Sequence, residues 1–260
     1  VDALGNAEAT HDEVEKVDTQ APETTKEVGD PKHACEPEEE CDYYINQSTP
    51  ITMTCNDLDP HPVNGTSIWY YYCVSDVPGF AGADCTDATQ YNGSFTFPQD
   101  SRHNLYYWCE DALGNREETQ NEVDVVDSQP PVVVKEVGEP KVACSDLNQS
   151  GCDYYITQQT PISFSCRDLN PHPVDHEQVF YRYQVNGGAW TDWTVFDGKD
   201  AFYFPEDSNH TLEYYCADAL NNSAGVYSEV DIVDTQAPHS TKEVGEPKVA
   251  CQDGEGCDYY

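Results

Sequence analysis

The sequence predicts an all-β fold in which two complete β-sandwich domains follow one another in tandem. Short alternating or aromatic runs recur roughly every 10 residues between turn-forming residues, and no segment keeps a helical period. The motif VDTQAP begins at Val17 and Val233, and its variant VDSQPP begins at Val126, which gives spacings of 109 and 107 residues. Because a solenoid coil spans only about 20 to 50 residues, this period indicates whole domains.

The repeat also predicts the domain boundaries. The motif KEVG-(D/E)-PK follows each VDTQAP-type motif and begins at Lys26, Lys135 and Lys242. Two copies then continue through a Cys, DL-(D/N)-PHPV, F-x-FP, a second Cys and DAL-(G/N)-N. We therefore expect the end of one repeat, two full repeats and the start of another, as in a window cut from a longer array, with boundaries at 1–17, 18–126, 127–233 and 234–260.

The strands of the second full repeat are predicted by β-rich runs bounded by Pro, Gly, Asn and Asp. The turn Asn186-Gly187-Gly188 indicates a hairpin, because Asn and Gly tolerate the positive φ that tight hairpin turns need. Antiparallel strands without crossover helices form a two-sheet sandwich of about 100 residues. The predicted strands are Pro161–Cys166, Val179–Val185, Ala189–Phe196, Ala201–Phe204, Thr211–Cys216 and Val226–Val233.

Cysteine spacing makes the sandwich immunoglobulin-like. Cys55 and Cys109 are 54 residues apart and Cys166 and Cys216 are 50 apart, as expected for the disulfide between strands B and F of such a domain. The remaining cysteines form three short local pairs and one pair found only in the first copy. We expect the disulfides Cys35–Cys41, Cys144–Cys152, Cys251–Cys257 and Cys73–Cys85, and they contribute much of each domain's stability.

Aromatic residues occupy two positions that are typical of the same fold. Trp69 and Phe180 each lie 14 residues after the first long-range cysteine, where strand C places its core aromatic. Tyr107 and Tyr214 each lie two residues before the second cysteine, where a tyrosine corner is expected. The match of both positions in both copies supports the immunoglobulin-like prediction.

The compartment follows from disulfides and glycosylation motifs. Twelve cysteines without a CxxC or Cys/His cluster favour disulfides over zinc or redox chemistry, and disulfides persist in oxidising, extracytoplasmic compartments. Asn-x-Ser/Thr triplets are typical acceptors of N-linked glycans in secreted proteins. They begin at Asn46, Asn64, Asn92, Asn148, Asn209 and Asn221. We expect an extracellular or cell-surface glycoprotein.

Composition excludes two classes of partner. Asp and Glu total 49 against 12 Lys and Arg, a net charge of −37, which disfavours binding to nucleic acid or to an anionic membrane. No apolar run of about 18 residues is present for a membrane span. The expected partners are other copies of the protein in a filament or surface layer, and cell-surface or glycan partners.

Enzymatic motifs are absent from the sequence. It contains no nucleophile elbow, phosphate loop or HExxH motif, so we expect no enzyme and no catalytic residues. His61 and His172 lie in PHP motifs, and His103 and His210 precede the second long-range cysteine. A structural role in turns and strand edges is favoured for these histidines over metal binding.

Carboxylates cluster at each junction between repeats, and calcium is the one ligand that they predict. Ca²⁺ takes about six to eight oxygen ligands, and each junction offers several acidic side chains. The alternative is a solvated acidic surface that serves solubility or high salt. Strand alternation places Glu122 and Asp124 on one face and Asp127 on the other, which weakens a single shared site. The candidate ligands are Asp18, Asp111, Glu122, Asp124, Asp127, Asp218, Glu229, Asp231 and Asp234.

The motifs together resemble the tandem Ig-like repeat domains of archaeal, and more distantly bacterial, cell-surface proteins. The resemblance rests on D-(T/S)-QAP, TKEVG-(D/E)-PK, TPI, DL-x-PHPV, YRYQVNGGAWTDW, F-x-FP and H-x-LEYYCADALNN, and it covers essentially the whole chain. It implies an extracellular modular protein such as a stalk, adhesin, surface-layer component or filament. The many cysteines and the acidity depart from the usual pattern.

The function expected from these observations is structural. Proline-containing linkers of a few residues between sandwiches predict a rod, so we expect a segment of a long extracellular filament or cell-surface stalk. Two alternatives remain open at this point. The repeats serve as the spacer of an adhesin whose binding domain lies elsewhere, or Tyr-rich stretches such as Cys41-Asp42-Tyr43-Tyr44 make a carbohydrate-binding module.

Overall fold

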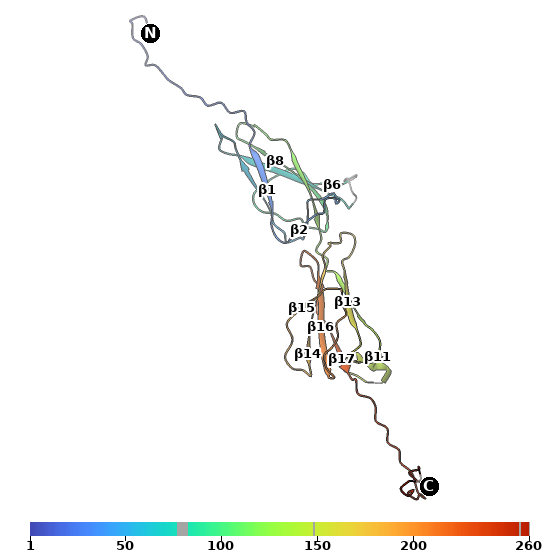
Figure 1. Cartoon of the computed structure of the whole chain (residues 1–260). Coiled ribbons are helices and arrows are strands. Elements are labelled where there is room, and N and C mark those ends of the chain that lie inside the picture. Colours follow the sequence, from blue (N-terminus) through green and yellow to red (C-terminus); the bar gives the residue numbers. More distant parts are fainter. Residues whose placement is uncertain (77–82, 148, 255, 260) are drawn as a thin grey trace.

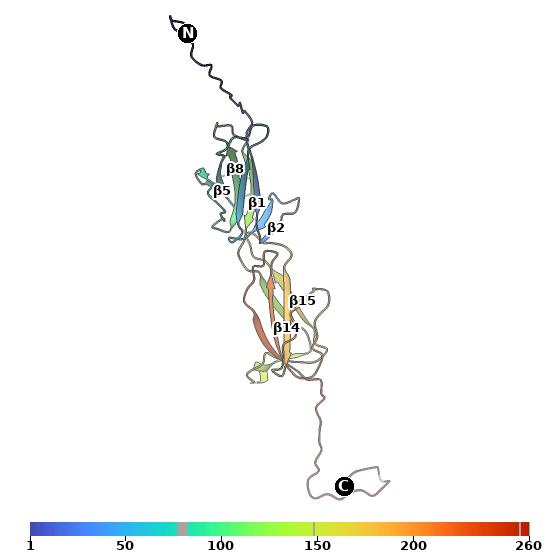
Figure 2. The ribbon, with the colours of Figure 1, turned by 90° about the vertical axis from the view of Figure 1, so that its left-hand side faces the viewer.

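The computed structural model contains two β-sandwich domains that lie end to end, with the two termini at opposite ends of an elongated molecule (Figures 1 and 2). It describes residues 1–76, 83–147, 149–254 and 256–259. Residues 1–22 contain no strand and extend away from the first domain, and residues 234–249 extend likewise from the second (Figure 1). The fold is therefore all-β and elongated, as the sequence predicts.

The first domain consists of a two-stranded sheet packed on a larger one. Strand β1 (Glu23–Val28) pairs antiparallel with β4 (Ile51–Asn56). The larger sheet has the order β2-β3-β9-β8-β5-β6, and β7 also pairs with β5. Its strands are β2 (Lys32–Ala34), β3 (Tyr43–Ile45), β9 (Gln120–Val126), β8 (Ser101–Glu110), β5 (Ser67–Val74), β6 (Asp84–Cys85) and β7 (Thr89–Gln90).

The second domain repeats this plan. Strand β10 (Val132–Val137) pairs with β13 (Ile162–Arg167), and the larger sheet has the order β11-β12-β17-β16-β14-β15. A 3-10 turn, Cys144–Leu147, follows β11. The strands of the larger sheet are β11 (Lys141–Ala143), β12 (Tyr154–Ile156), β17 (Tyr227–Val233), β16 (Asn209–Ala217), β14 (Gln178–Val185) and β15 (Thr194–Phe196).

The path of the first strands makes each sandwich immunoglobulin-like. The chain leaves the small sheet after β1 and joins the large one through β2 and β3, and β3 pairs parallel with the last strand, β9. The crossing occurs at Gly29, where an added Cβ would lie 2.6 Å from Pro50 Cγ, and Gly138 meets Pro161 at the same distance. Only glycine fits this close approach, which explains the Gly of the KEVG motif.

The strand predictions hold in part. The run at 189–196 is a strand only over β15, and residues 201–204 contribute one bridge, Phe202 to Ile162, rather than a strand. Between the Asn186 turn and β15, the chain pairs with β14 through an isolated bridge between Gln184 and Trp190. The strands β10, β11 and β12 were not predicted.

The core aromatic of β5, and of its counterpart β14, was predicted one residue too early. Cys109 faces the core and lies opposite Ile68, so alternation directs Trp69 to the outer face, opposite Trp108. The aromatic that packs against the core is Tyr70. In the second domain Tyr181 packs against the core, and Phe180 stacks outside it on Tyr215.

All twelve cysteines form disulfides, in the pairs that the sequence predicts. The two long-range bonds connect β4 to β8 and β13 to β16, and so join the two sheets of each domain. Cys73–Cys85 joins β5 to β6. The short bonds are Cys35–Cys41, Cys144–Cys152 and Cys251–Cys257.

Candidate functional sites at the domain junction and in the core

Three aspartates meet at the junction between the two domains. Asp127 follows the last strand of the first domain, and Asp168 and Asp218 follow strands β13 and β16 of the second. One carboxylate oxygen from each lies within 4.8 Å of the others, and all three residues are buried. We call this set the junction cluster.

Hydrogen bonds from the local backbone hold two of these carboxylates in place. Asp218 Oδ1 accepts from the N–H of Leu220 at 2.8 Å and of Asn222 at 2.9 Å. Asp168 accepts from its neighbour Leu169 at 2.8 Å and from Val174 N–H at 2.7 Å. Since a carboxylate has about four lone-pair sites, each still has acceptor capacity for a further ligand.

Asn222 connects the linker to the second domain. Its Nδ2 donates to Asp218 Oδ2 at 2.8 Å and to the backbone oxygen of Asp127 at 3.1 Å. The linker aspartate is thus positioned by the domain that follows it.

The electrostatics of the junction cluster are unfavourable for three carboxylates alone. Burial raises the pKa of Asp127 to about 7, and the nearby charges of Asp168 and Asp218 add to the shift. Burial also raises the pKa of Asp218. Among the described residues, no Lys, Arg or His lies within ion-pair distance of these three carboxylates. The cluster therefore lacks a balancing cation from the protein.

The first domain carries the same cluster at its own leading end. Asp18, Asp57 and Asp111 occupy the equivalent positions, and their carboxylate oxygens also lie within 4.8 Å of one another. Asn115 donates to Asp111 Oδ2 at 2.8 Å and to Asp18 at 3.4 Å, as Asn222 does in the second domain. Here Asp18 and Asp57 are only half-buried, and residues 1–17, which precede them, contain no strand.

Direct contacts across the junction include three side-chain pairs, one of them His33 and His176, whose ring centroids lie 4.9 Å apart. His172 Nε2 lies 2.9 Å from Asp76 Oδ1 of the first domain, and Asn46 Nδ2 lies 3.5 Å from Asn222 Oδ1. The equivalent His61 of the first domain is exposed. The contact between domains therefore accounts for the burial of His172.

The other carboxylates predicted as calcium ligands lie elsewhere. Glu122 and Asp124 point into the first domain, where both contact Lys26, and Glu229 and Asp231 contact Lys135 in the second. The alternation of strand β9 separates them from Asp127, which lies beyond its end. Asp234 is exposed at the position equivalent to Asp127, and residues 235–260 contain no counterpart of Asp168 or Asp218.

The lysine contacts form a second site, which we call the core triad. Lys26 Nζ on β1 lies 2.8 Å from Asp124 Oδ2 and 2.6 Å from Glu122 Oε2, both on β9. The side chains of Lys26 and Asp124 are 1% and 0% exposed. Because β1 and β9 belong to different sheets, this triad spans the core.

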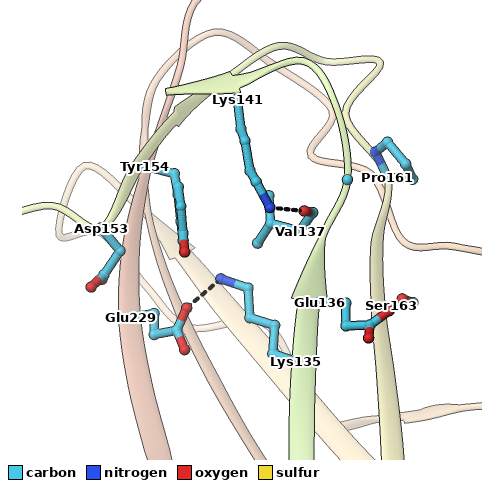
Figure 3. Close-up of a pocket in the computed structure, with 10 residues that line it drawn as sticks. Lys135, Glu136, Val137, Lys141, Asp153, Tyr154, Pro161, Ser163 and Glu229 are labelled. Carbon is cyan, nitrogen blue, oxygen red and sulfur yellow. Dashed lines mark hydrogen bonds and ion pairs between the residues drawn. The ribbon is translucent and has the colours of Figure 1, made fainter. Parts of the chain in front are cut away.

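The second domain reproduces the core triad closely. Lys135 Nζ lies 2.8 Å from Asp231 Oδ2 and 2.6 Å from Glu229 Oε2. Figure 3 shows Lys135 on β10 reaching across to Glu229, at a pocket of about 520 Å³ that Asp153 and Tyr154 also line. A smaller pocket of about 310 Å³ adjoins Lys26 and Glu122.

The hydroxyls of Tyr107 and Tyr214 make different hydrogen bonds from the one that defines a tyrosine corner, so that prediction is wrong. Tyr107 and Tyr214 are buried, as expected, but their hydroxyls donate to carboxylates of the core triads rather than to upstream backbone. Tyr107 Oη lies 3.0 Å from Glu122 Oε1, and Tyr214 Oη lies 2.6 Å from Glu229 Oε1. A tyrosine thus fixes the glutamate of each triad.

The remaining predicted positions divide between surface and core. Asn64, Asn92, Asn209 and Asn221 are exposed, Asn46 is half-buried at the junction, and Asn148 lies outside the described residues. His103 and His210 are fully buried, with ring centroids 4.2 Å from those of Phe97 and Phe204. They pack in the core rather than in turns, and each Nδ1 lies 3.2 Å from the backbone oxygen two residues earlier, at Ser101 or Ser208.

Sequence analysis did not single out Asp57, Asp168, Lys26 or Lys135 as site residues. The signal was present in the repeat, because both aspartates stand two residues after the first long-range cysteine and both lysines open KEVG. This signal did not identify a site, because equal spacing in the two copies does not show which residues lie close together in the folded domain.

Comparison with known structures gave likenesses at low sequence identity. No family model and no curated protein sequence matches the chain. Fibronectin(III)-like modules of Clostridium thermocellum CbhA align with 84% of this chain and 100% of their own at 13% identity and a TM-score of 0.36. The three N-terminal domains of the bacteriophage RB49 highly immunogenic outer capsid protein align over 83% of this chain and 71% of that chain. Their sequence identity is 10% and the TM-score is 0.36.

A third likeness is to the FN1–FN3 domains of chicken CNTN1, over 73% of this chain and 65% of that one, at 10% identity and a TM-score of 0.29. We draw no function from likenesses at these TM-scores. Among the described residues, no helix is long and apolar enough to span a bilayer.

Proposed function

We propose that this chain is a structural, non-enzymatic segment of an extracellular filament or cell-surface stalk. The observation that carries the proposal is the junction, where the linker aspartate of one domain is built into the leading end of the next. Such a joint transmits orientation from domain to domain, and tandem copies of it make a rod. The resemblance to tandem Ig-like repeats of archaeal cell-surface proteins supports the same role.

We also propose that each junction cluster binds a calcium ion. Three carboxylates supply hard oxygen ligands without a competing protein cation, and backbone N–H groups already orient them. Carbonyl groups and water would complete the about six to eight ligands that Ca²⁺ takes. Bound calcium would join the linker to two loops of the following domain and so stiffen the joint.

The extracellular setting of the proposal rests on the six disulfides, which are typical of proteins that fold in oxidising compartments. The four exposed Asn-x-Ser/Thr positions are accessible to N-linked glycans. Partners would be further copies of the protein along or beside the rod. In the adhesin alternative, the same rod acts as a spacer that carries a binding domain.

Electron microscopy of the native material, in calcium and after chelation, tests the proposed function. Ordered filaments with an axial repeat of one or two domains support the structural role. Isolated flexible tethers in both conditions would contradict the filament and leave the adhesin spacer.

A further inference from the structure

Each core triad holds a buried lysine amine beside carboxyl groups with which it can react, and a structural rod does not require this arrangement. In each domain a lysine of the first strand lies against an aspartate of the last strand, inside the core. Lys26 Nζ lies 2.8 Å from Asp124 Oδ2, and Lys135 Nζ lies 2.8 Å from Asp231 Oδ2. The same arrangement occurs twice, at residues of the repeat that correspond to each other.

A buried ion pair is an expensive element for such a small core. Desolvation of two charges is repaid only when hydrogen bonds satisfy all their remaining polar atoms. Asp124 Oδ1 and Asp231 Oδ1 are buried and have no hydrogen-bond partner among the described residues. Burial accordingly raises the pKa of Asp124 to about 6, although Lys26 opposes the shift, and it raises the pKa of Asp231 as well.

We propose that Lys26 and Asp124, and likewise Lys135 and Asp231, condense into intramolecular isopeptide bonds. The ammonium group of the lysine first passes one proton to the aspartate carboxylate, which gives a neutral amine and a carboxylic acid. The amine then attacks Asp Cγ, a C–N bond forms, and a C–O bond breaks. One amine hydrogen and the carboxyl hydroxyl leave as water, so no oxidant or other reactant is needed. The reaction replaces two buried charges with an amide, and it removes one carboxyl oxygen from the core.

Glu122 is placed to carry the proton in this reaction. Its Oε2 lies 2.6 Å from Lys26 Nζ, so it can accept the amine proton and pass it to the departing hydroxyl of Asp124. Tyr107 holds the other oxygen of Glu122 at 3.0 Å and fixes its orientation. The pocket beside Lys26 and Glu122 gives the released water a path out.

Glu229 and Tyr214 occupy the same positions around Lys135. Figure 3 shows the Glu229 carboxylate beside Lys135, with a dashed line marking their contact. The two domains therefore serve as internal replicates of one reaction.

The bond has a direct mechanical consequence, which goes beyond the proposed calcium joint. Tension along the chain enters a domain near β1 and leaves it near β9. A covalent bond between Lys26 and Asp124 joins these two strands across the sheets. The load then passes through the bond, and the chain between the two residues carries none of it.

Intact mass spectrometry of the full 260-residue chain tests the proposal. The chain is produced in a bacterial periplasm, where its disulfides form and eukaryotic N-glycans do not. The expected mass, after correction for the disulfides, is below the sequence mass by two water molecules. Proteolysis should yield a branched peptide that joins the Lys26 segment to the Asp124 segment. A mass equal to the disulfide-corrected sequence mass would overturn the proposal.

Single and double variants separate the chemistry from folding. Glu122→Gln should lose one water only, Glu229→Gln should also lose one, and the double variant should lose none. In each single variant the unchanged domain is the matched control within the same molecule. Circular dichroism establishes that the variants fold. A double variant that still loses two waters would overturn the role of the glutamates, and a Lys26→Arg variant that loses two would overturn the assignment of the bond.

Discussion

One substitution in the junction cluster should have opposite effects on thermal stability in the presence and in the absence of calcium. Carboxylate oxygens of Asp127, Asp168 and Asp218 lie within 4.8 Å, and at that distance two unit charges repel by roughly 3.5 kcal/mol at an effective dielectric constant of about 20. Full ionisation of all three without a cation would cost roughly 10 kcal/mol, which is comparable to the stability of a whole domain of about 5 to 15 kcal/mol. Burial and this repulsion raise the pKa of Asp127 to about 7, so part of the charge is lost near neutral pH. Removal of one charge relieves most of this repulsion.

Asp168→Asn is consequently expected to raise the melting temperature of the second domain in chelator and to lower it in calcium. With free calcium at about 100 times Kd, binding contributes about 2.7 kcal/mol. For a domain of this size that corresponds to a shift of roughly 10 to 20 °C in the unsubstituted chain. The variant should lose most of this shift.

Differential scanning calorimetry of both chains, in calcium and in chelator, measures these shifts. Asp175→Asn removes an exposed charge from the same loop and is the matched control, with a shift like that of the unsubstituted chain. A destabilising effect of Asp168→Asn that is equal in both conditions would refute the reasoning, because it would assign Asp168 a role in loop folding alone.

Three further outcomes follow from the structure. Burial lowers the pKa of His103 to about 4 from 6.5, so the unfolded chain binds more protons than the folded one between these pH values. The free energy of unfolding should therefore fall by up to about 3 kcal/mol as pH drops from 6.5 to 4. Urea titrations at several pH values should show that His103→Phe lacks this part of the pH dependence. Replacement of Cys55 and Cys109 by Ala opens a 54-residue loop and should cost about 4 kcal/mol by chemical denaturation; a cost near zero would contradict the stapled-core account. In single-molecule pulling, a domain with the Lys26–Asp124 bond should barely extend, whereas Glu122→Gln should release roughly 40 residues outside the disulfide loops, or about 130 Å of chain; equal extension would contradict the bond.

Much of the fold was predictable because the repeat supplied internal comparison. The spacing of Cys55 to Cys109 and of Cys166 to Cys216 indicated the strands that the long disulfides connect, and the structure pairs them so. The aromatic position was less certain, because a strand with aromatics at successive positions offers both faces a large side chain. Only the pairing register places Tyr70 inside and Trp69 outside.

The candidate sites were predictable only in part, for a physical reason. Asp127 and Asp218 were candidate ligands that flank recognisable strands, but which carboxylates meet was not predicted: the structure groups Asp218 with Asp127 and Asp111 with Asp18. Asp168 reaches its cluster through a loop whose path no periodicity reveals. Glu122 and Asp124 appeared to be surface carboxylates because charged residues are rarely fully buried. Their burial depends on Lys26, about 100 positions away in the chain, which pairs with them inside the core.

The central claim is that the junction cluster, with calcium, fixes successive domains end to end. Small-angle X-ray scattering of the two-domain chain in calcium and in chelator tests it most directly. The account predicts the distance distribution of a straight rod in calcium and a broader distribution with a shorter mean extension in chelator, with Asp168→Asn resembling the chelated state in both. Identical scattering of the unsubstituted chain in the two conditions would contradict it.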